Sequence, residues 1–593
     1  MYRTHTCGEL TAKNKGEVTL SGWVHKRRDL GGVIFVDLRD RYGITQVVFH
    51  PDKVSNFSVV EGLKYEYIIK VTGKVVKRGK KSMNKELPTG EIEVMAKEIE
   101  VLSQAKPMPF EIFDAHKQEE DEDLRLKYRF LEIRREKLKN TLLFRARMLK
   151  VIRDFMDSHN FVELATPILT VSSPEGARDF LVPSRLHPGK FYALPQAPQQ
   201  YKQLLMVGGM DRYYQIAPCM RDEDPRADRS PGEFYQLDTE TSFLTSDEFF
   251  ELMEPLFVEL TEFAGKKIKE QPFPRVPYKE IMETYGSDRP DLRYDLKIKD
   301  ASEWAKQTGF KVFNEAKFVR ALTIPDGAKF TRKEIDDEFT DVAKRAHAKG
   351  LAWMKFVEGK FDGTIVKFFS EQELKSLQGL LSPEEGSIVF FSAGDWSVSC
   401  TSLGAVRSLA AKKLNLADKD LIAWAWVVDF PMYEKREENG EISTKGGPAS
   451  GWDFGHNPFS MPKGGKEALD GKDPLEILAD QYDIIANGLE ISSGAVRNKD
   501  PEIMYKAFKI AGYDKKAVDA KFGHMIKAFE YGAPPHCGFA PGIERLVMLL
   551  TNEDNIRNVV PFPKNQKAEE PMMGSPSDVS IEQLKELSIK LDL

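Results

Sequence analysis

The fold is decided by the stretch Tyr213-Tyr-Gln-Ile-Ala-Pro-Cys-Met-Arg-Asp-Glu223, which resumes as Gly232-Glu-Phe-Tyr-Gln-Leu-Asp-Thr-Glu240. Arg221 falls where its strand pattern passes into a loop. Two other stretches frame it along the chain. Phe161-Val-Glu-Leu-Ala-Thr-Pro167 predicts a strand that ends at a proline, and Gly538-Phe-Ala-Pro-Gly-Ile-Glu-Arg545 leads into the helical pattern Gly542–Leu550. We therefore expect a mixed region of strands and helices around these stretches.

Length and composition describe an ordinary globular protein. The chain has 593 residues, enough for roughly three to five domains. It is 41% hydrophobic and 30% charged, which excludes a mainly disordered or fibrous chain. No stretch approaches the roughly 18 apolar residues of a membrane span, and the N-terminus has no apolar signal core. We expect a soluble cytoplasmic protein that does not enter a membrane.

The cysteines and the charge distribution add two constraints. Cys7, Cys219, Cys400 and Cys537 lie far apart without a CxxC pair, which argues against a disulfide framework and a structural zinc site. Residues 1–105 carry a net charge of +5, against −6 for the whole chain. This excess is compatible with a solvated surface or with a binding site for a polyanion.

Residues 1–105 also have the pattern of a small barrel. Five β-rich segments are separated by Gly, Asp or Asn, and they predict a five-stranded oligonucleotide-binding (OB) barrel; they are residues 17–25, 32–39, 44–49, 67–76 and 90–94. Phe35 and Gln46 would lie near the basic runs 25–28 and 77–81. Basic groups and an aromatic ring together suit single-stranded nucleic acid, although a core position for Phe35 would fit the same spacing.

The rest of the chain divides by changes in pattern. Apolar residues recur at threes and fours between Leu142 and Met156, which predicts an amphipathic helix that ends near His159-Asn160. Residues 293–424 change character and suggest an inserted α/β domain. The expected organisation is a barrel (1–105), a hinge or linker (106–140), a first catalytic part (141–290), the insertion (291–423), a second catalytic part (424–563) and a C-terminal extension (564–593).

The three stretches, in this order, resemble motifs 1, 2 and 3 of the class II aminoacyl-tRNA synthetases. Further segments make the resemblance closer, namely residues 174–183, 191–200, 221–229 and 482–488. With them, nearly the whole chain resembles the bacterial-type aspartyl-tRNA synthetases of subclass IIb. The resemblance implies a multidomain α+β protein. Its parts would be an N-terminal OB-fold barrel, an antiparallel β-sheet catalytic domain flanked by helices, and the inserted, GAD-like α/β domain of the bacterial form.

The activity implied by this resemblance is ATP-dependent ligation of L-aspartate to the 3′ end of tRNA(Asp), through an aspartyl-adenylate. Such chemistry needs positioned cations rather than a side-chain nucleophile. Three alternatives stay open at this point. They are a non-discriminating enzyme that also charges tRNA(Asn), a synthetase-derived ligase that amidates aspartate, and a non-catalytic RNA-binding paralogue.

The resemblance also assigns site residues. Arg221 and Arg545 match the catalytic arginines that grip the α-phosphate and the far end of the triphosphate. The aspartate-binding positions are Glu175, Gln199, Lys202, Arg221, Asp238, His456 and Arg497. The ATP-binding positions are Arg221, Asp222, Glu223, Phe234, Glu490, Gly542, Ile543, Glu544 and Arg545. Asp483 and Glu490 match the Mg²⁺-binding positions, and Gly488 between them favours a strand pair over a helix.

Substrate choice is expected to rest on charge. Lys202 and Arg497 match positions that pair with the side-chain carboxylate of the substrate, and two cations in one pocket disfavour a neutral or cationic amino acid. Asp238 would hold the ammonium group with help from Gln199. Three departures from the family pattern put individual contacts in doubt: Ser230 where glutamine is common, Asn457 where a second histidine is common, and Ala197 where serine is common.

The remaining expectations concern macromolecular partners. Arg28, Phe35, Gln46 and Glu93 match the barrel residues that read the anticodon, with the ring stacked on the central base. Non-discriminating relatives often carry histidine where this chain has Leu30, which favours an enzyme specific for tRNA(Asp). A homodimer is expected because motif 1 forms the subunit interface in class II enzymes, although burial within one subunit would produce the same 142–156 periodicity.

Overall fold

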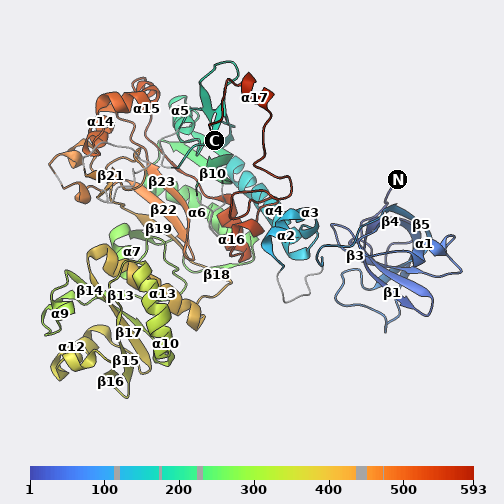
Figure 1. The fold of residues 1–593 in the computed structure, drawn as a ribbon, viewed down its shortest axis with the longest axis horizontal. Coiled ribbons are helices and arrows are strands. Elements are labelled where there is room, and N and C mark those ends of the chain that lie inside the picture. The colour runs from blue at the N-terminus through green and yellow to red at the C-terminus, as the bar shows by residue number, and fades with distance from the viewer. Residues whose placement is uncertain (113–119, 173–176, 224–231, 436–450, 472, 593) are drawn as a thin grey trace. The chain divides into compact units, whose positions relative to one another are not determined.

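The computed structural model describes residues 1–112, 120–172, 177–223, 232–435, 451–471 and 473–592 (Figure 1). Residues 1–112 and 113–593 form two compact units. The first unit therefore extends past the expected boundary at 105. Within the described ranges, no helix is both long and apolar enough to cross a membrane.

The first unit is a closed five-stranded barrel with the strand order β1-β2-β3-β5-β4. Its elements are β1 (Glu17–Leu30), β2 (Val33–Arg39), β3 (Ile44–Phe49), α1 (Phe57–Glu61), β4 (Ile68–Lys77) and β5 (Ile92–Ser103). Alternate residues such as Ile34, Val36 and Leu38 point into a closed core, as the period of two requires. The OB-fold expectation is confirmed.

The strand ends differ from the sequence prediction. The basic run after His25 continues β1 up to Leu30 instead of forming a connection, because Lys26, Arg27 and Arg28 pair with residues of β2. Gly31 and Gly32 close this hairpin with positive φ angles of 64° and 84°. β5 likewise continues to Ser103 along β4. Charged residues on the outer face of a barrel do not interrupt its hydrogen-bonded ladder.

The second unit is built around an eight-stranded sheet with the order β12-β19-β22-β23-β24-β10-β9-β6. These strands are β6 (Val162–Glu163), β9 (Arg212–Arg221), β10 (Gly232–Ser242), β12 (Arg275–Pro277), β19 (Trp424–Val428), β22 (Gln481–Ala486), β23 (Leu489–Val496) and β24 (His536–Phe539). The six central strands are antiparallel, whereas both edge strands, β6 and β12, pair in parallel. The sheet is therefore mixed at its edges rather than antiparallel throughout. The strand expected over 161–167 is limited to the two residues of β6.

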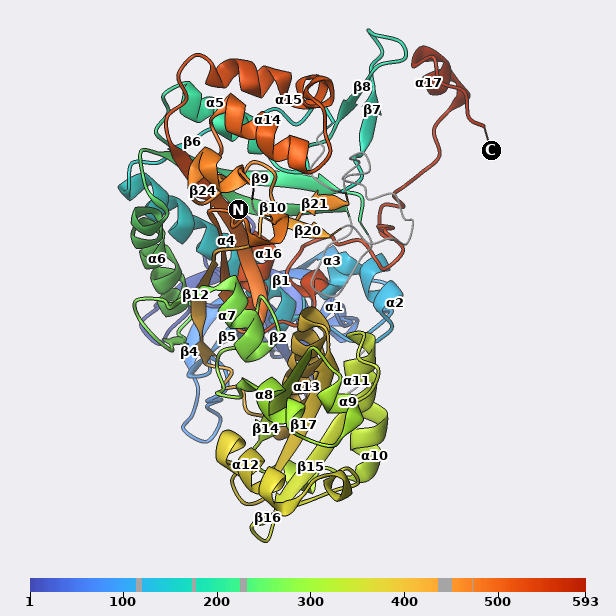
Figure 2. The same cartoon turned by 90° about the vertical axis from the view of Figure 1, so that its left-hand side faces the viewer.

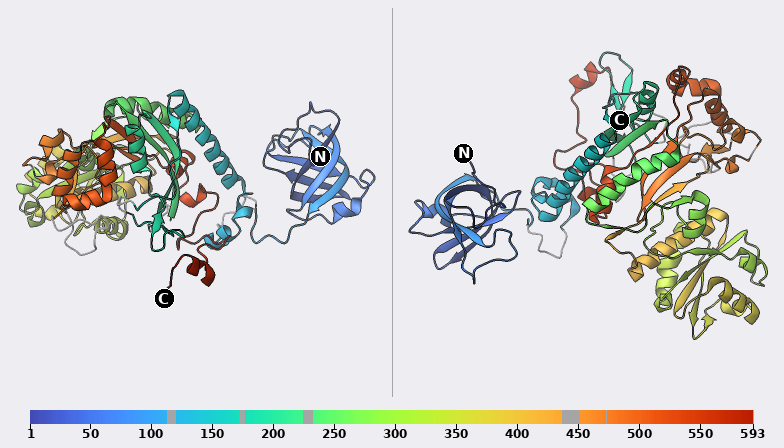
Figure 3. Two further views of the ribbon diagram at one scale, coloured as in Figure 1. Left: turned by 90° about the horizontal axis from the view of Figure 1, so that it is seen from above. Right: turned by 180° about the vertical axis from the view of Figure 1, so that it is seen from behind.

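Three helices cover one face of this sheet. They are α4 (Glu136–Ser158), α6 (Ser246–Phe263) and α16 (Ile543–Thr551). Their apolar residues form the largest core together with strand residues such as Leu237 and Phe539. Figure 3 shows α4 and α6 side by side, in agreement with their contacts. Met148, Ile152 and Phe155 of α4 are buried against this core, so burial within the subunit accounts for much of the helical periodicity of 142–156.

Shorter helices and two-stranded pieces complete the second unit around this sheet. The helices are α2 (Glu122–Lys127), α3 (Arg129–Glu132), α5 (Gln199–Val207), α7 (Tyr278–Tyr285), α14 (Pro501–Ile510), α15 (Lys515–Phe529) and α17 (Ile581–Glu586). The two-stranded pieces are β7 (Leu181–Pro183) with β8 (Phe191–Ala193), β11 (Lys267–Ile268) with β18 (Leu421–Ile422), and β20 (Tyr433–Lys435) with β21 (Trp452–Phe454). α15 packs against α5 (Figure 2).

Between β12 and β19 the chain forms a separate five-stranded sheet with the order β13-β14-β17-β15-β16. Its elements are β13 (Ile298–Asp300), β14 (Phe318–Ile324), β15 (Ala352–Val357), β16 (Lys360–Asp362), β17 (Ser387–Gly394), α8 (Ser302–Lys306), α9 (Lys311–Asn314), α10 (Arg332–Glu334), α11 (Thr340–Arg345), α12 (Glu371–Leu381) and α13 (Trp396–Leu414). Each face of the sheet has its own apolar core. This antiparallel sheet with its helices lies within the range for which the sequence predicts an inserted α/β domain.

Candidate active site

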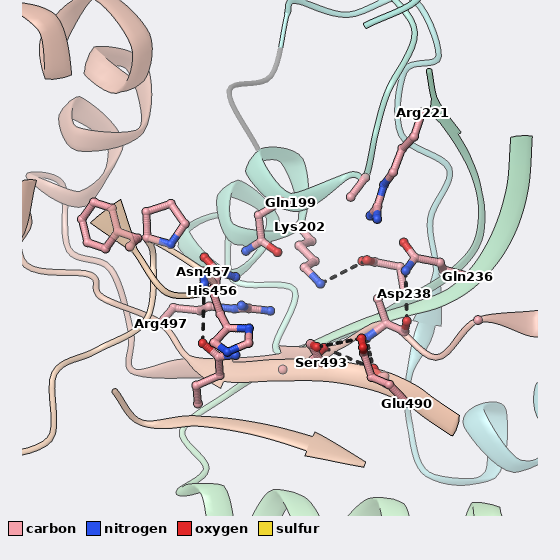
Figure 4. Close-up of a pocket in the computed structure, with 18 of the residues that line it drawn as sticks. Gln199, Lys202, Arg221, Gln236, Asp238, His456, Asn457, Glu490, Ser493 and Arg497 are labelled. Atoms are coloured by element: carbon pink, nitrogen blue, oxygen red, sulfur yellow. Dashed lines mark hydrogen bonds and ion pairs between the residues drawn. The ribbon is translucent and has the colours of Figure 1, made fainter. Parts of the chain in front are cut away.

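A cavity of about 410 Å³ opens in the second unit beside the central strands β10 and β23 (Figure 4). The predicted site residues that line it are Gln199, Lys202, Arg221, Glu223, Phe234, Asp238, His456, Glu490, Arg497, Gly542, Glu544 and Arg545. They come from α5, β9, β10, β23, the segment after β21 and the start of α16. Segments more than 300 residues apart are thus brought to one surface. Glu175 and Ser230 lie outside the described residues.

Glycines allow the strands under the cavity to approach closely. A Cβ atom on Gly538 of β24 would lie 2.1 Å from the Thr239 backbone oxygen and 2.4 Å from Oε2 of Glu240. A Cβ atom on Gly494 of β23 would lie 2.5 Å from the Gly538 backbone oxygen. No real side chain tolerates these distances, so both positions require glycine.

Four buried charges form one cluster at an end of the cavity. Lys202 Nζ lies 3.1 Å from Asp238 Oδ2 and 3.3 Å from Glu240 Oε2. Arg497 binds the same Glu240 through Nε and Nη2, at 2.8 and 3.1 Å. None of the four is more than 2% exposed. The two cations are therefore balanced by two anions, of which the sequence prediction included Asp238 but not Glu240.

The cluster shifts the pKa values of its acids in opposite directions. Burial raises the pKa of Asp238 to about 6, against the opposing effect of Lys202. Burial also opposes ionisation of Glu240, but the adjacent Arg497 and Lys202 outweigh it and lower the pKa of that carboxyl. Glu240 is thus held as a carboxylate, and Asp238 is the group in the cluster that titrates near neutral pH. Asp238 Oδ1 is buried without a hydrogen-bond partner in the structure.

Arginines mark the other end of the cavity. The guanidinium of Arg221 lies 5.0 Å from the ring centroid of Phe234, and its Nε donates to the Gln196 carbonyl at 3.3 Å. Arg545 lies in the first turn of α16 and donates from Nη1 to the Glu490 carbonyl at 2.7 Å. The helix start adds partial positive charge at this point. An aromatic ring and two arginines that line one cavity are suited to a base and its phosphates.

Asp483 and Glu490 belong to the strand pair β22–β23, as the glycine at 488 indicates. Asn487 and Gly488 form the two-residue turn with φ angles of 50° and 88°. Burial, followed by the nearby Glu490, raises the pKa of Asp483 well above its usual range, and its Oδ1 is buried without a partner. Two carboxylates on paired strands, one with an orphaned oxygen, fit a divalent cation that takes its other ligands from phosphates and water. Glu490 lines the cavity, whereas Asp483 is not among its described lining residues. The described residues contain no group of three or more acidic, histidine or cysteine side chains placed to hold a metal alone.

Three of the predicted ATP-binding residues, Asp222, Ile543 and Glu544, make contacts with other parts of the protein. Asp222 is absent from the described lining of the cavity, and its carboxylate pairs with Arg178 at 3.4 Å. Ile543 is fully buried in the core beneath α16. Glu544 accepts from Arg145 of α4 at 2.7 Å and from the Tyr235 backbone amide at 3.0 Å, and burial raises its pKa. Glu544 therefore fastens the start of α16 to β10 and α4.

Two of the departures from the family pattern lie at the cavity. Asn457 and Ala197 both line it. Asn457 accepts from the Phe459 backbone amide at 2.8 Å, which holds the loop that carries His456. His456 itself packs edge to face on Phe430, with ring centroids 4.8 Å apart.

The predicted anticodon residues form a connected group on the outside of the barrel. Arg28 donates to Asp37 at 2.9 Å and to Gln46 at 3.1 Å, and Gln46 donates to Glu93 at 2.9 Å. Phe35 is half-buried on the same strand as Asp37, while Ile34 and Val36 fill the core. A core position for Phe35 is therefore wrong. Leu30, at the end of β1, is 65% exposed.

Sequence reasoning missed several polar residues of the cavity. Gln236, Asp453, Gln481, Ser492 and Ser493 line it, and Glu240 lies behind Lys202 and Arg497. Glu240 could have been found, because it follows Asp238 by two positions in a strand and must share its face. Gln236 could have been found in the same way, because it precedes Asp238 by two positions in β10. The others carry no local signal, since their place depends on how β21, β22 and β23 meet β10.

Comparison with known proteins gives concordant matches. A family model described as tRNA synthetases class II (D, K and N) matches residues 121–566, and one described as an OB-fold nucleic acid binding domain matches residues 18–102. An aspartate–tRNA(Asp/Asn) ligase of Chlorobium phaeobacteroides (strain BS1) is 51% identical over 598 positions, covering 100% of this chain and 96% of the relative. An aspartate–tRNA ligase of Streptomyces avermitilis is 51% identical over 596 positions, covering 100% and 98%.

Solved structures show the same fold at low sequence identity. The aspartyl tRNA synthetase from Entamoeba histolytica superposes with a TM-score of 0.56 at 19% identity, covering 93% of this chain and 89% of that one. The asparaginyl-tRNA synthetase of the same organism, solved with asparaginyl-adenylate, gives a TM-score of 0.57 at 16% identity, covering 95% and 98%.

Proposed function

This chain belongs to the class II tRNA synthetases of the D, K and N group, and from that membership we propose that it is an aspartate–tRNA ligase. The observation that carries the proposal is the buried cluster of Lys202, Asp238, Glu240 and Arg497 at one end of a cavity whose other end holds Arg221 and Arg545. One end suits a small zwitterion with an acidic side chain. The other suits a nucleoside triphosphate.

In the first step, an α-carboxylate oxygen of aspartate attacks the α-phosphorus of ATP and pyrophosphate leaves. Arg221 lines the same cavity as the charge cluster, so its guanidinium can bridge the carboxylate and the α-phosphate. Arg545, at the start of α16, holds the departing end of the triphosphate, and Phe234 stacks on the adenine. In the second step, the 3′-terminal ribose hydroxyl of tRNA attacks the acyl carbon and AMP leaves.

Magnesium is proposed as the cofactor, held with ATP by Asp483 and Glu490. When bound, it neutralises polyphosphate charge. The contribution of the chain is to place two carboxylates on adjacent strands, with Ser493 Oγ donating to Glu490 Oε1 at 3.2 Å.

The selection of aspartate follows from where the charged groups of the pocket lie rather than from the net charge of the pocket. Lys202 and Arg497 present cations to the side-chain carboxylate, while Asp238 presents an anion to the ammonium group. Glu240 lies behind both cations and compensates their burial. Asparagine would bring a neutral amide to these N–H donors, so it would lose the charge-assisted hydrogen bonds that a carboxylate accepts, and its own NH2 group would face donors.

The test is ATP/pyrophosphate exchange followed by tRNA charging. Purified protein should exchange pyrophosphate with aspartate and not with asparagine, glutamate or lysine, and should then transfer aspartate to tRNA(Asp). Exchange with another amino acid would refute the assignment. Exchange together with asparagine synthesis from ammonia would favour an amidating ligase, against which the barrel of residues 1–112 argues.

A second candidate is an enzyme that also charges tRNA(Asn). Relatives of both kinds are equally similar to this chain, at 51% identity. Leu30 favours the specific enzyme, because it stands where non-discriminating relatives often carry histidine. Aspartylation of purified tRNA(Asn), compared with tRNA(Asp), decides between them, and a Leu30→His variant should move the ratio towards tRNA(Asn).

The barrel is proposed to bind the anticodon through Phe35 and the group of Arg28, Gln46 and Glu93. Phe35→Ala should reduce charging of tRNA(Asp) by roughly tenfold or more, because stacking on one base is worth about 1–3 kcal/mol. Aspartate-dependent exchange should stay unchanged. Tyr42→Ala, which removes an exposed ring at the other end of β2, is the matched control and should affect neither assay. Equal losses in both assays for Phe35→Ala would contradict the assignment.

A homodimer and a cytoplasmic location complete the proposal. Exposed apolar side chains near motif 1, among them Val162, Ile168 and Leu169, support a partner surface in that region. Sedimentation of the protein would test it. Four buried cysteines without a disulfide suit the reducing cytoplasm.

A further inference from the structure

Behind the predicted ammonium site, two glutamines and a histidine form a buried relay of hydrogen bonds. Gln199 and Gln203 lie one turn apart on α5, and Gln199 Nε2 donates to Gln203 Oε1 at 3.2 Å. Gln203 Nε2 lies 3.1 Å from Nε2 of His536 on β24. Nδ1 of His536 lies 2.8 Å from the Pro534 carbonyl oxygen. Gln203 and His536 are 0% exposed.

The carbonyl at the end of this relay fixes its direction. A carbonyl oxygen only accepts, so Nδ1 of His536 must carry a hydrogen. In the neutral ring, Nε2 is then an acceptor, and the amide nitrogen of Gln203 must donate to it. Burial lowers the pKa of His536 and favours this neutral form; Glu240 opposes that shift, while Arg497 and Lys499 add to it. The oxygen of Gln203 is left to accept from Gln199.

The same logic orients the amide of Gln199. Its nitrogen is committed to Gln203, so its oxygen occupies the opposite side of the planar amide. Gln199 lines the cavity, and Figure 4 shows it beside Lys202, which in turn contacts Asp238. An oxygen there accepts from an ammonium group, whereas a flipped amide would present N–H groups to the same cation.

We propose that His536 and Gln203 are positioning residues that lock the Gln199 amide with its oxygen towards the ammonium group of the amino-acid substrate. The inference rests on the proposed function, because it needs an α-amino acid in this pocket. Two acceptors, the Asp238 carboxylate and the Gln199 oxygen, then face the ammonium group. The locked amide makes the pocket selective for a ligand that carries this group.

The test compares aspartate with succinate, which has both carboxylates but no ammonium group. His536→Phe keeps a ring and removes the acceptor nitrogen. Gln203→Met, at similar side-chain volume, removes both the donor to His536 and the acceptor for Gln199. Each should raise the KM for aspartate in ATP/pyrophosphate exchange by roughly tenfold. The inhibition constant of succinate and the KM for ATP should stay within about twofold. His536→Gln places an amide oxygen near the Nε2 position and should restore the aspartate KM.

His524→Phe is the matched control. His524 also contacts a glutamine of α5, Gln200, at 2.5 Å, but neither residue is part of the described lining of the cavity. This variant should change neither the KM for aspartate nor the inhibition constant of succinate. The proposal is overturned if folded His536→Phe or Gln203→Met leaves the aspartate KM unchanged, or if aspartate and succinate weaken together. A wild-type protein without aspartate-dependent exchange would instead refute the function itself.

Discussion

Glu240 compensates the positive charge of Lys202 and Arg497 in the pocket. It accepts from Arg497 and lies 3.3 Å from Lys202, so the cations are already neutralised before a ligand enters. Burying two unpaired cations would be costly, and pairing each of them with one carboxylate removes most of that cost. The pocket is therefore prepared for a charged ligand without carrying net charge.

The raised pKa of Asp238 predicts how stability and activity depend on pH. Burial raises its pKa to about 6, so the folded protein binds this proton more tightly than the unfolded chain does. Above about pH 6 the carboxyl of Asp238 is ionised in the folded protein, and the burial of this charge lowers the stability of the fold. The loss of stability disappears as the pH falls towards 4, where the carboxyl is protonated in the folded protein. Activity should have the opposite dependence on pH, because only the ionised carboxylate of Asp238 attracts the ammonium group of the substrate. The kcat/KM for aspartate should fall as the pH is lowered through about 6.

The pH profile needs one control, because His536 is a buried histidine near the cluster and burial lowers its pKa. In His536→Gln the inflection near pH 6 should persist, since Asp238 is unchanged. In Asp238→Asn, kcat/KM should be low and flat. A wild-type profile without an inflection between about pH 5 and pH 8 would contradict the prediction.

At the scale of elements, the floor of the site depends on how closely β10, β23 and β24 approach. Gly538→Ala would drive a Cβ into the Thr239 carbonyl and the Glu240 carboxylate, at 2.1 and 2.4 Å. We expect a loss of about 3 kcal/mol in stability and a higher KM for aspartate, because Glu240 must move. Thermal unfolding and exchange kinetics measure the two effects.

Gly523→Ala is the matched control for this substitution. Gly523 lies within α15, where a Cβ would meet only Asp519 Cβ at 3.9 Å. Alanine should leave stability unchanged or raise it by up to about 1 kcal/mol, since it favours the helix. If Gly538→Ala were equally harmless, the close approach of the strands would not constrain the site.

At the scale of the whole molecule, the two compact units predict a separation of tasks. The described residues that line the cavity all lie within residues 113–593, and the predicted anticodon group lies within residues 1–112. Deleting residues 1–112 should leave aspartate-dependent exchange within about twofold. Charging of tRNA(Asp) should fall by roughly a hundredfold, because several base contacts are lost together. A comparable loss in both reactions would show that the first unit supports the active site.

Local patterns in the sequence determined the elements of this protein. Alternation of apolar residues predicted the barrel, and spacing at threes and fours predicted α4, since both depend on which face of an element is buried. The motifs around Arg221, Asp238 and Arg545 identified the family, and the resemblance supplied most of the charged residues that line the cavity. Strand ends were predicted less well, because the pairing of Lys26–Arg28 with β2 depends on a neighbouring strand.

Only the tertiary structure decided how these residues act on one another. Glu240 meets Arg497 across 257 positions of sequence, and Gln203 meets His536 across 333. Such contacts depend on the register of strands and on the packing of α5 against β10, which no local pattern encodes. The sequence therefore supplied the charged groups of the site, while the packing of distant segments set their pairing, their pKa values and the direction of their hydrogen bonds.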